Sequence, residues 1–489
     1  MSGFFGVVAA SDCREDLFYG TDYHSHLGTR RGGMATCGKN GFSRYIHDIS
    51  NALFRSKFSG DVSAMSGNKG IGVISDYEDQ PLIISSHLGT YAIATIGTIK
   101  NQRDLTQLAY RNHRAHFSNM NDGDVNPTEL AASLVNLGAS YEEGIRLAQE
   151  SIDGSCSLLI LTQEGLYVAR DRYGRTPIVM GSREGATAVA FESCALPNLG
   201  YTVDRDLGPG EIIKLTEDGV HVLRPPDKDE RICSFLWIYY GFPASSYNGI
   251  NVEESRYRSG AFLAKHDDIR GDLVMGVPDS GVGHALGYAA ESRLPYARPI
   301  VKYTPTWARS FMPGEQEHRV RIAKMKLIPI PRIIEGKHIV FLDDSIVRGT
   351  QLRDMGTLLQ SFGAKAVHAR IACPPLLFDC RFLNFSRSTS VMELVARRAM
   401  KELSGKSDDL TACTFSHPDS DEHRAMVANI NARLKLSSLR YQRVDDCVAA
   451  IGLPKARVCT YCFDGVEGGS ACGGACAMPC RKPAMPEPL

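Results

Sequence analysis

The first half of the chain alternates short apolar runs with Gly, Asn and Asp. The clearest runs are residues 3–10, 70–74, 91–99, 156–162 and 210–215. They are rich in β-branched and aromatic residues, which is typical of strands. Helical spacing occurs between some of them, as at residues 127–137, where Asn126 or Thr128 could cap the helix. The pattern predicts a mixed first half that begins with a buried strand near residue 3.

The pattern changes after residues 224–231, a polar segment with two prolines that is the best candidate linker. Residues 273–277, 338–342 and 366–371 are apolar strands, and helical stretches follow the first two. Repeated strand–helix units predict a parallel sheet with ligands at the carboxyl ends of its strands. We therefore expect one domain over residues 1–230, a second over 231–465, and a Cys-, Gly- and Pro-rich tail over 466–489.

Composition narrows the class of protein. The 489 residues are 43% hydrophobic and 22% charged, which is ordinary for a globular chain. The 55 basic and 55 acidic residues cancel, so overall charge gives no reason to expect nucleic-acid or membrane binding. No uninterrupted apolar window of about 18 residues predicts a membrane span, and no export signal is visible. We expect a cytoplasmic chain whose 14 cysteines are reduced or bind metal.

One stretch places chemical groups in the order that a phosphate site needs. Asp343, Asp344 and Ser345 follow a strand, and residues 348–350 lead into a helix. Backbone N–H groups and hydroxyls at a helix start can bind phosphate, and the carboxylates could hold a sugar diol or Mg²⁺. An Asp-Asp pair alone would fit a surface loop equally well, but the whole string 339–350 is more specific.

That string resembles the phosphoribosylpyrophosphate (PRPP) motif of type I phosphoribosyltransferases. Over nearly its whole length the chain is similar to the amidophosphoribosyltransferase family, including residues 277–281, 308–327, 374–375 and 240–256. The resemblance implies that ammonia displaces pyrophosphate from C1 of PRPP, giving phosphoribosylamine in the first step of purine synthesis. It also implies the fold class: an α+β N-terminal-nucleophile domain with αββα layers, like class II glutamine amidotransferases, followed by an α/β type I phosphoribosyltransferase domain.

The resemblance implies residue roles as well. The ribose hydroxyls and Mg²⁺ would be held by Asp343 and Asp344, and the 5′-phosphate by Ser345, Arg348, Gly349 and Thr350. The pyrophosphate would be held by Asp279, Ser280 and Gly281 together with the basic residues Lys302, Arg309 and Lys326. Residues 308–327 would form a loop that closes over PRPP and excludes water.

The first half resembles the family's glutaminase domain but departs from it at the reactive positions. The family's nucleophile is a cysteine that becomes residue one and uses its own α-amine as base; this chain has Ser2. The arginine that anchors glutamine aligns with Ser75, and the Asn-Gly oxyanion pair becomes Ile96-Gly97. A serine nucleophile alone would be tolerable, but losing one oxyanion donor typically costs about 10²–10³ in rate. We therefore expect a degenerate glutaminase domain, with nitrogen from free ammonia or a partner glutaminase.

The late cysteines leave several interpretations open. Cys459 and Cys462 form a C-x-x-C pair, which alone fits metal or redox chemistry. A zinc site could add Cys472 and Cys476, whereas a thioredoxin-like motif lacks the expected early βαβ context. The family resemblance instead implies a structural [4Fe–4S] cluster held by Cys233, Cys380, Cys459 and Cys462. Cys472, Cys476 and Cys480 would be exposed tail thiols or a second metal site.

Other residues and functions are weighed in the same way. His24 and His26 lack a third ligand nearby in sequence, so we expect structural roles for them, as for His113, His116 and a surface pair Arg397-Arg398. Besides the ammonia-using enzyme, a non-catalytic or regulatory paralogue that binds PRPP or nucleotides and a transferase with another acceptor remain open. The family also suggests purine nucleotides as inhibitors and a homo-oligomer, either tetramer or dimer.

Overall fold

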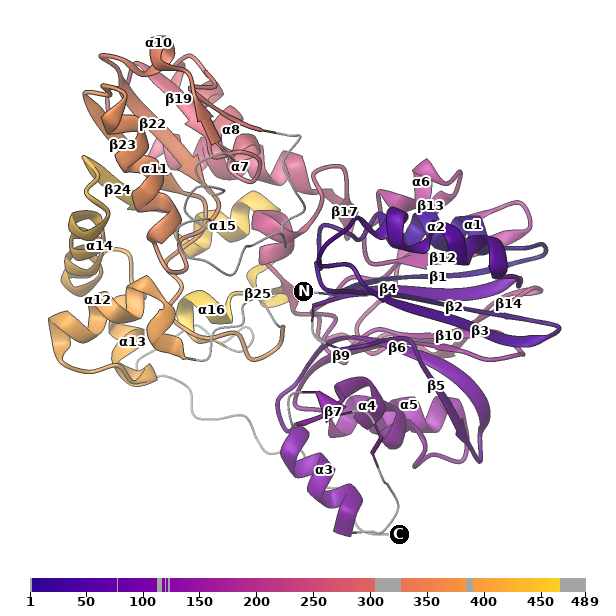
Figure 1. Cartoon of the computed structure of the whole chain (residues 1–489). Coiled ribbons are helices and arrows are strands. Elements are labelled where there is room, and N and C mark those ends of the chain that lie inside the picture. The colour runs from indigo at the N-terminus through magenta and orange to yellow at the C-terminus, as the bar shows by residue number, and fades with distance from the viewer. Residues whose placement is uncertain are drawn as a thin grey trace.

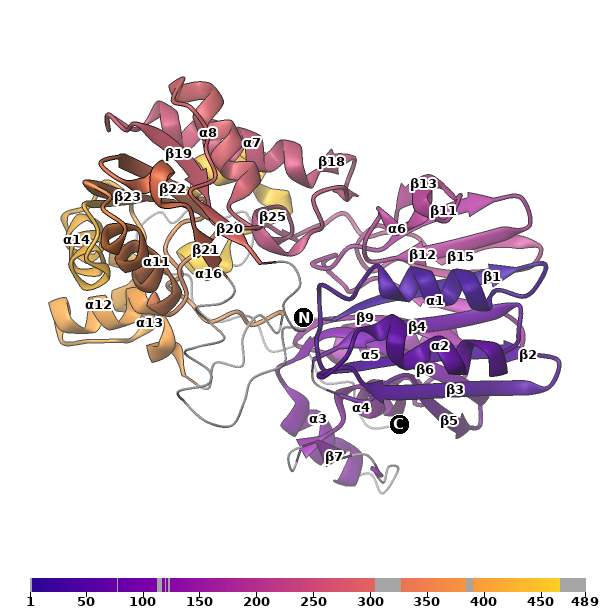
Figure 2. The same cartoon turned by 45° about the horizontal axis from the view of Figure 1, so that its top comes forward.

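The computed structural model describes residues 2–76, 78–111, 117–118, 120–121, 124–303, 327–383 and 390–466. Figure 1 shows two lobes, one built from the first half of the chain and one from the second. The marker of the chain start lies between the lobes both there and in the turned view of Figure 2. The first strand, β1 (Gly3–Ala9), therefore starts on the side of its lobe that faces the other lobe.

The first lobe contains a seven-stranded antiparallel sheet in the order β13-β11-β12-β1-β4-β2-β3. Its other strands are β2 (Arg31–Gly38), β3 (Gly41–Asp48), β4 (Lys69–Ser75), β11 (Val179–Arg183), β12 (Ala186–Ala190) and β13 (Thr202–Asp206). All seven residues of β1 are buried and pair with β4 and β12, which confirms the predicted first strand. Two helices, α1 (Arg14–Asp22) and α2 (Phe54–Ala64), pack on this sheet.

A second antiparallel sheet lies against the first, in the order β15-β14-β10-β9-β6-β5. Its strands are β5 (Leu82–Ser86), β6 (Gly89–Ile99), β9 (Gly154–Leu161), β10 (Leu166–Ala169), β14 (Ile212–Thr216) and β15 (Gly219–Arg224). Ala92 and Ala94 of β6 face the first sheet, while the alternating Tyr91 and Ile93 face the helices, as the two-residue period of a strand requires.

The helices of that outer layer are α3 (Gln102–Arg111), α4 (Pro127–Val135) and α5 (Tyr141–Ser151), beside the short pair β7 (Met120–Asn121) and β8 (Asp124–Val125). Of the two expected caps for α4, Asn126 is the one observed, because its side chain accepts from the Thr128 N–H at 2.8 Å. The lobe therefore has the expected αββα layers.

The second lobe is built on a parallel sheet in the order β19-β22-β23-β24. Its strands are β19 (Leu273–Gly276), β22 (His338–Asp343), β23 (Ala366–Ile371) and β24 (Ser438–Tyr441). Val274 and Val340 pack toward α7 (Val252–Lys265) and α8 (Val282–Ser292). The alternate residues Met275 and Phe341 pack in the cluster that includes α11 (Thr350–Ser361) and α14 (Asp421–Leu434). Helices thus cover both faces of the sheet, as expected.

Shorter elements complete the molecule; the first of them packs against β12 and β13 in the first lobe, and the others belong to the junction and the second lobe. They are α6 (Ala195–Asn198), β16 (Ile232–Cys233), the π-helix η1 (Leu236–Tyr240), β17 (Ser246–Tyr247), β18 (Ile250–Asn251), β20 (Ile300–Lys302), β21 (Leu327–Pro329), α10 (Pro331–Ile334), η2 (Val391–Glu393), α12 (Val395–Ser404), α13 (Asp409–Phe415), α15 (Val444–Ile451), η3 (Lys455–Arg457), β25 (Val458–Cys459) and α16 (Tyr461–Asp464). β16 pairs in parallel with β25, so the late part of the chain returns to the junction.

Two predictions meet limits here. The expected domain limits near 230 and 465 stay a prediction, and the tail lies almost wholly outside the described residues.

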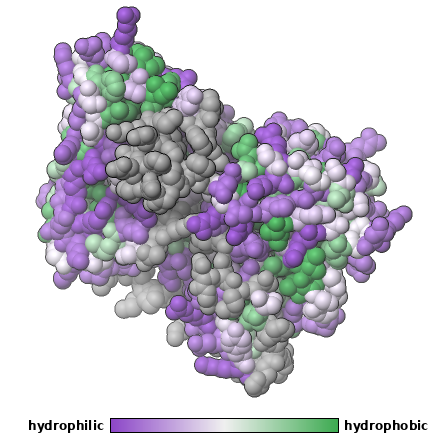
Figure 3. All heavy atoms as spheres, viewed as in Figure 1, coloured by the Kyte–Doolittle hydropathy of each residue, from purple (hydrophilic) through white to green (hydrophobic). Residues whose placement is uncertain are grey.

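Within the described part of the chain, no helix is long and apolar enough to cross a membrane. The face seen in Figure 3 mixes hydrophilic and pale residues with a few green areas.

Candidate active site and cysteine cluster

The Asp343–Asp344 pair lies at the carboxyl end of the buried strand β22. The two side chains are 8% and 6% exposed. The Asp344 N–H donates to Asp343 Oδ1 at 3.0 Å, and Ser345 Oγ donates to Asp344 Oδ2 at 2.5 Å. Burial, followed by the charge of Asp344, raises the pKa of Asp343 well above its ordinary value, and burial also raises the pKa of Asp344. A ligand that offers hydroxyl groups or a cation would relieve this crowding of negative charge.

The loop after the neighbouring strand β19 reaches the same place. Ser280 hydrogen-bonds both carboxyl groups, so the two predicted loops form one site. The Val277 N–H donates to the Leu342 carbonyl at 2.8 Å. A Cβ on Gly281 would lie 2.2 Å from that carbonyl oxygen, so only glycine allows the loops to approach this closely.

The predicted phosphate groove begins at α11. Gly349 has φ +81° and precedes the helix, and among the described residues no side chain caps the first turn. The N–H groups of the first turn of α11 and the Thr350 hydroxyl can therefore donate hydrogen bonds to an anion. The exposed Arg348 pairs with Glu393, and Lys302 Nζ lies 2.5 Å from Asp279 Oδ2. Arg348 and Lys302 are therefore both at the solvent-exposed edge of the site.

Two predicted pyrophosphate ligands, Arg309 and Lys326, lie outside the described residues, together with most of the expected closing loop. The same holds for His113, His116 and the three tail cysteines. Their roles therefore stay predictions.

Sequence reasoning gave no role to a buried arginine beneath the site. The Arg256 side chain donates to the carbonyls of Trp237 at 3.0 Å, Tyr239 at 3.0 Å and Gly241 at 2.9 Å, at the end of the π-helix. Its positive charge also acts to lower the pKa of Asp344, against the larger effect of burial. The match of Arg256 to the family's junction segment was the available signal, but its bonds to main-chain carbonyls cannot be read from sequence.

The four predicted cluster cysteines come together at the junction. Cys233 and Cys459 are register partners in the β16–β25 pair. The Cys462 thiol, in α16, lies close enough to Cys380, Cys233 and Cys459 for their charges to raise its pKa. Burial is the main effect that raises the pKa of all four thiols, and for Cys380 it raises the pKa to about 12. Four thiols so close together, two of them buried and two half-buried, are costly to ionise without a bound cation.

Backbone N–H groups point at these sulfur atoms. The Leu383 N–H donates to Cys380 Sγ at 3.3 Å. N–H groups of Phe235 and Leu236 bond to Cys233, and that of Tyr461 bonds to Cys459. Among the described residues, no group of three or more His, Cys, Asp or Glu is spaced to hold a single metal ion. Four buried or half-buried cysteines, three of them with N–H···S bonds, fit the donor set of a larger iron–sulfur cluster.

Two of the expected departures in the glutaminase-like lobe, Ser2 and Ser75, lie side by side. Ser2 Oγ donates to Ser75 Oγ at 3.3 Å, which puts the residue at the nucleophile position beside the one at the anchor position. Ile96 is buried on β6, and Gly97 has φ +127°. A Cβ on Gly97 would lie 1.9 Å from the Ser155 carbonyl oxygen, so the close pairing of β6 with β9 requires glycine at this position.

A buried polar network of Glu78, Gln80 and Thr95 begins three residues after Ser75 in the sequence. Gln80 Nε2 donates to Glu78 Oε1 at 2.8 Å and to the Thr95 carbonyl at 3.0 Å, and the Thr95 N–H donates back to Gln80 Oε1 at 2.7 Å. Burial raises the pKa of Glu78 to about 7. An acid and an amide that satisfy each other do not replace a guanidinium as an anchor for a substrate carboxylate.

The two histidines near residue 25 have protein partners. His24 is buried, its Nδ1 lies 2.8 Å from the Gly20 carbonyl, and its Nε2 accepts from the Glu192 N–H at 3.0 Å. Burial lowers its pKa to about 4. His26 Nε2 lies 2.8 Å from Glu192 Oε1. These contacts agree with the structural roles expected for both.

The expectation for Arg397 was wrong. Its side chain is fully buried and donates to the Leu377 and Ser407 carbonyls and to Asp409. The polar groups of neighbouring loops satisfy its donors, so burial is tolerated. Sequence spacing alone had suggested a helix surface.

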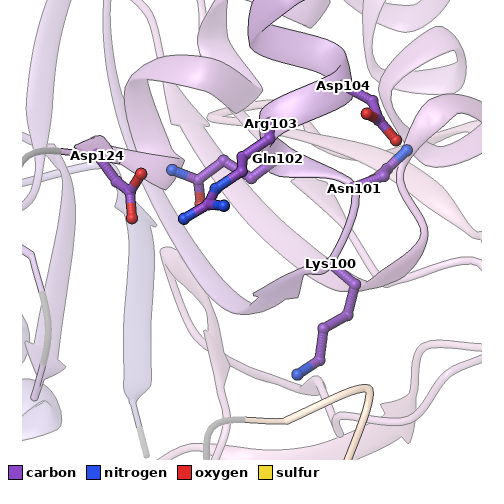
Figure 4. A pocket seen from close by; sticks show the side chains of 6 residues that line it. All are labelled: Lys100, Asn101, Gln102, Arg103, Asp104 and Asp124. Atoms are coloured by element: carbon purple, nitrogen blue, oxygen red, sulfur yellow. The ribbon is translucent and has the colours of Figure 1, made fainter. Parts of the chain in front are cut away.

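A hollow of about 350 Å³ lies elsewhere, at the start of α3. Lys100, Arg103 and Asp124 are among its lining residues; in Figure 4 Arg103 extends toward Asp124, and Lys100 points away from both. Figures 1 and 2 place α3 far from β22, so this hollow is separate from the Asp343 site.

Comparisons with known proteins agree with this geometry. A model of the glutamine amidotransferase domain matches residues 70–198. The chain is 30% identical to an amidophosphoribosyltransferase of Methanocaldococcus jannaschii, over 83% of this chain and 90% of the relative. The chain belongs to the amidophosphoribosyltransferase family. A second amidophosphoribosyltransferase, from Bacillus subtilis, is also 30% identical, over 82% of this chain and 85% of that protein.

Solved structures extend the match to the whole fold. Glutamine PRPP amidotransferase from B. subtilis, in complex with ADP and GMP, superposes with a TM-score of 0.82 and 27% identity, covering 95% of this chain and 96% of that one. A structure described as the allosteric regulatory enzyme of purine biosynthesis gives 0.80 and 26%, covering 95% of both chains. The expected family and fold class are therefore confirmed.

Proposed function

We propose that the chain catalyses transfer of the phosphoribosyl group of PRPP to ammonia, giving 5-phosphoribosylamine and pyrophosphate in de novo purine synthesis. The amidophosphoribosyltransferase relatives support this reaction. The observation that carries it here is the meeting of Asp343, Asp344 and Ser280 beside an uncapped helix start.

In this proposal each group acts on one part of PRPP. The first turn of α11, with Ser345, Arg348 and Thr350, binds the 5′-phosphate, and the buried carboxylates hold the ribose hydroxyls. The loop 279–281 takes the pyrophosphate with Lys302, and Arg309 and Lys326 are assigned to the same group. Asp343 and Asp344 would also hold Mg²⁺, which neutralises pyrophosphate charge when bound.

The chemical step needs few protein groups. The ammonia nitrogen forms a bond to C1 while the C1–O bond to pyrophosphate breaks, and the electron pair leaves with pyrophosphate. The amine then loses a proton. Orientation and exclusion of water are the main contributions expected of the protein.

The nitrogen source is the second part of the proposal. Ser2, Ser75 and Ile96 together replace the expected nucleophile, anchor and oxyanion donor, so the first lobe serves as scaffold. Ammonia comes from solution or from a partner glutaminase.

A [4Fe–4S] cluster on Cys233, Cys380, Cys459 and Cys462 is the third part. The proximity of the four thiols and the N–H···S bonds to three of them support it. Its role would be structural, since it would fasten β25 and α16 to the junction.

Regulation and assembly follow the family. Because a structural relative was solved with ADP and GMP, we propose purine nucleotides as inhibitors of a cytoplasmic homo-oligomer. A regulatory paralogue that binds PRPP without turnover is the alternative.

One assay separates these functions. PRPP-dependent pyrophosphate release is measured with glutamine, with ammonium and with neither. Turnover with ammonium but not glutamine is expected. Turnover with glutamine would overturn the scaffold role of the first lobe, and none with either donor would favour the paralogue.

A further inference from the structure

Arg175 lies in a loop of the first lobe that reaches the cysteine cluster. Asp171 fixes the loop: its Oδ1 accepts from the Arg175 N–H at 3.1 Å, and its Oδ2 accepts from the Thr176 N–H at 3.1 Å. The Arg175 carbonyl accepts from the Cys233 N–H at 3.2 Å. The backbone of this loop is therefore bonded directly to one of the four cysteine residues.

The Arg175 side chain continues toward the other thiols. It is 1% exposed, and its guanidinium carbon lies 3.5 Å from the ring centre of Phe382 and 4.9 Å from that of Tyr173. Two aromatic faces so close hold a guanidinium in a fixed plane. Phe382 follows Cys380 by two residues, so this stacking places the cation beside the cluster.

The contact with sulfur completes the arrangement. The Arg175 side chain hydrogen-bonds the Cys459 thiol. Cys459 is the register partner of Cys233, which bonds the Arg175 backbone. One residue of the first lobe thus contacts two of the four cysteines, which belong to distant parts of the second half of the sequence.

We propose that Arg175 is the counter-cation and sulfur hydrogen-bond donor of the cluster, so that the glutaminase-like lobe sets the cluster's electronic properties. The inference rests on the proposed cluster. Four thiolates give the cluster a net negative charge, and a buried donor cation at one sulfur stabilises the reduced form most. Net charge and hydrogen bonds to sulfur set the reduction potential of such clusters.

The test uses full-length chain purified without oxygen. Iron and sulfide are measured first, and the potential is then found by dithionite titration followed by electron paramagnetic resonance. In Arg175→Gln, we expect the one-electron reduction equilibrium to fall at least tenfold, a shift of about 59 mV to lower potential. Iron loss to a chelator should also become faster. Arg175→Lys should restore part of the potential, because it keeps the charge without the planar stacking.

The matched control is Arg172→Gln. Arg172 also lies over the Tyr173 ring, at 5.4 Å, but it is exposed. The Arg172→Gln variant should leave the reduction potential and the rate of iron loss to the chelator unchanged. Wild-type potential and chelation rate in Arg175→Gln would overturn the role of Arg175, and if that variant fails to fold, wild-type values of both in Arg175→Met would do the same. Absence of iron from the wild-type chain would overturn the cluster, while the pyrophosphate assay still tests transferase activity.

Discussion

Individual side chains at the Asp343 site work against the stability of the empty fold. Burial raises the pKa of both Asp343 and Asp344, so ionising them near neutral pH costs folding free energy. An acid whose pKa is raised in the folded state loses stability as the pH rises above its unfolded value. The two carboxyl groups therefore lower the stability of the fold, and their benefit lies in binding a ligand.

Asp344→Asn tests this directly. We expect kcat/KM for PRPP to fall by about 10²–10³ because one ribose ligand is lost. We also expect the melting temperature to stay equal or rise at pH 7, since a neutral amide removes the buried charge. Asp445→Asn, at an exposed position, should change neither quantity. A melting temperature that drops would contradict the charge argument.

Ser2→Ala tests the other lobe at the same scale. Ser2 donates one long hydrogen bond of 3.3 Å to Ser75, so little structure depends on it. Ammonium-dependent pyrophosphate release should match the wild type. Glutamate release from glutamine should be at background in both proteins, and a wild-type rate above background that disappears in Ser2→Ala would refute a scaffold role.

At the scale of elements, α11 is the part of the second lobe on which phosphate binding depends. Gly349, in the left-handed region, links the Asp343 loop to the helix, and no described side chain caps the first-turn N–H groups. The same conformation ends other helices, as at Gly405 after α12.

Gly349→Ala and Gly405→Ala form a matched pair. Both positions have positive φ, +81° and +72°, so alanine should cost each about 1 kcal/mol of stability. Only Gly349→Ala should raise KM for PRPP, because its Cβ would also press on Leu434 at 3.2 Å, whereas Gly405 has open space. Denaturant unfolding and PRPP titration of both variants check this, and equal KM values would argue against phosphate binding at α11.

At the scale of the whole molecule, buried carboxylates join the two lobes. Glu192 of the first lobe accepts from Tyr247 Oη at 2.7 Å and from the Phe242 N–H at 3.2 Å, besides its pair with His26. Burial would raise the pKa of Glu192, but the charge of His26 and the hydrogen bonds lower it overall. Glu230 similarly bonds Arg170 and Arg457.

Glu192→Gln tests the junction through its pH dependence. A carboxyl whose pKa is lowered in the folded state stabilises above its unfolded pKa, about 4.3, and loses that effect as the pH falls through the folded pKa. The variant should therefore be less stable than the wild type at pH 7, with a smaller difference near pH 3. Urea unfolding at both values measures this, and a constant difference would mean that the charge of Glu192 contributes nothing.

Much of this molecule could be predicted from sequence because its signals are local. Apolar strands and their following loops gave β1, β22 and the Asp343 loop, and the C-x-x-C pair pointed to Cys459 and Cys462. The buried Arg397 and the carbonyl contacts of Arg256 could not be found, since they depend on which loops pack around a long side chain. Arg175 was missed for the same reason: its partners lie far away in sequence and meet only in the folded chain.

The parallel pairing of β16 with β25 has a consequence for biosynthesis. These two strands bracket the second lobe in sequence, so they cannot meet until nearly the whole chain has left the ribosome. The first lobe has all its strands before β16 and can fold much earlier, as N-terminal domains generally do. During that interval Cys233 lacks Cys459 and Cys462 as neighbours, so the proposed iron–sulfur cluster could assemble only after β25 and α16 have been synthesised.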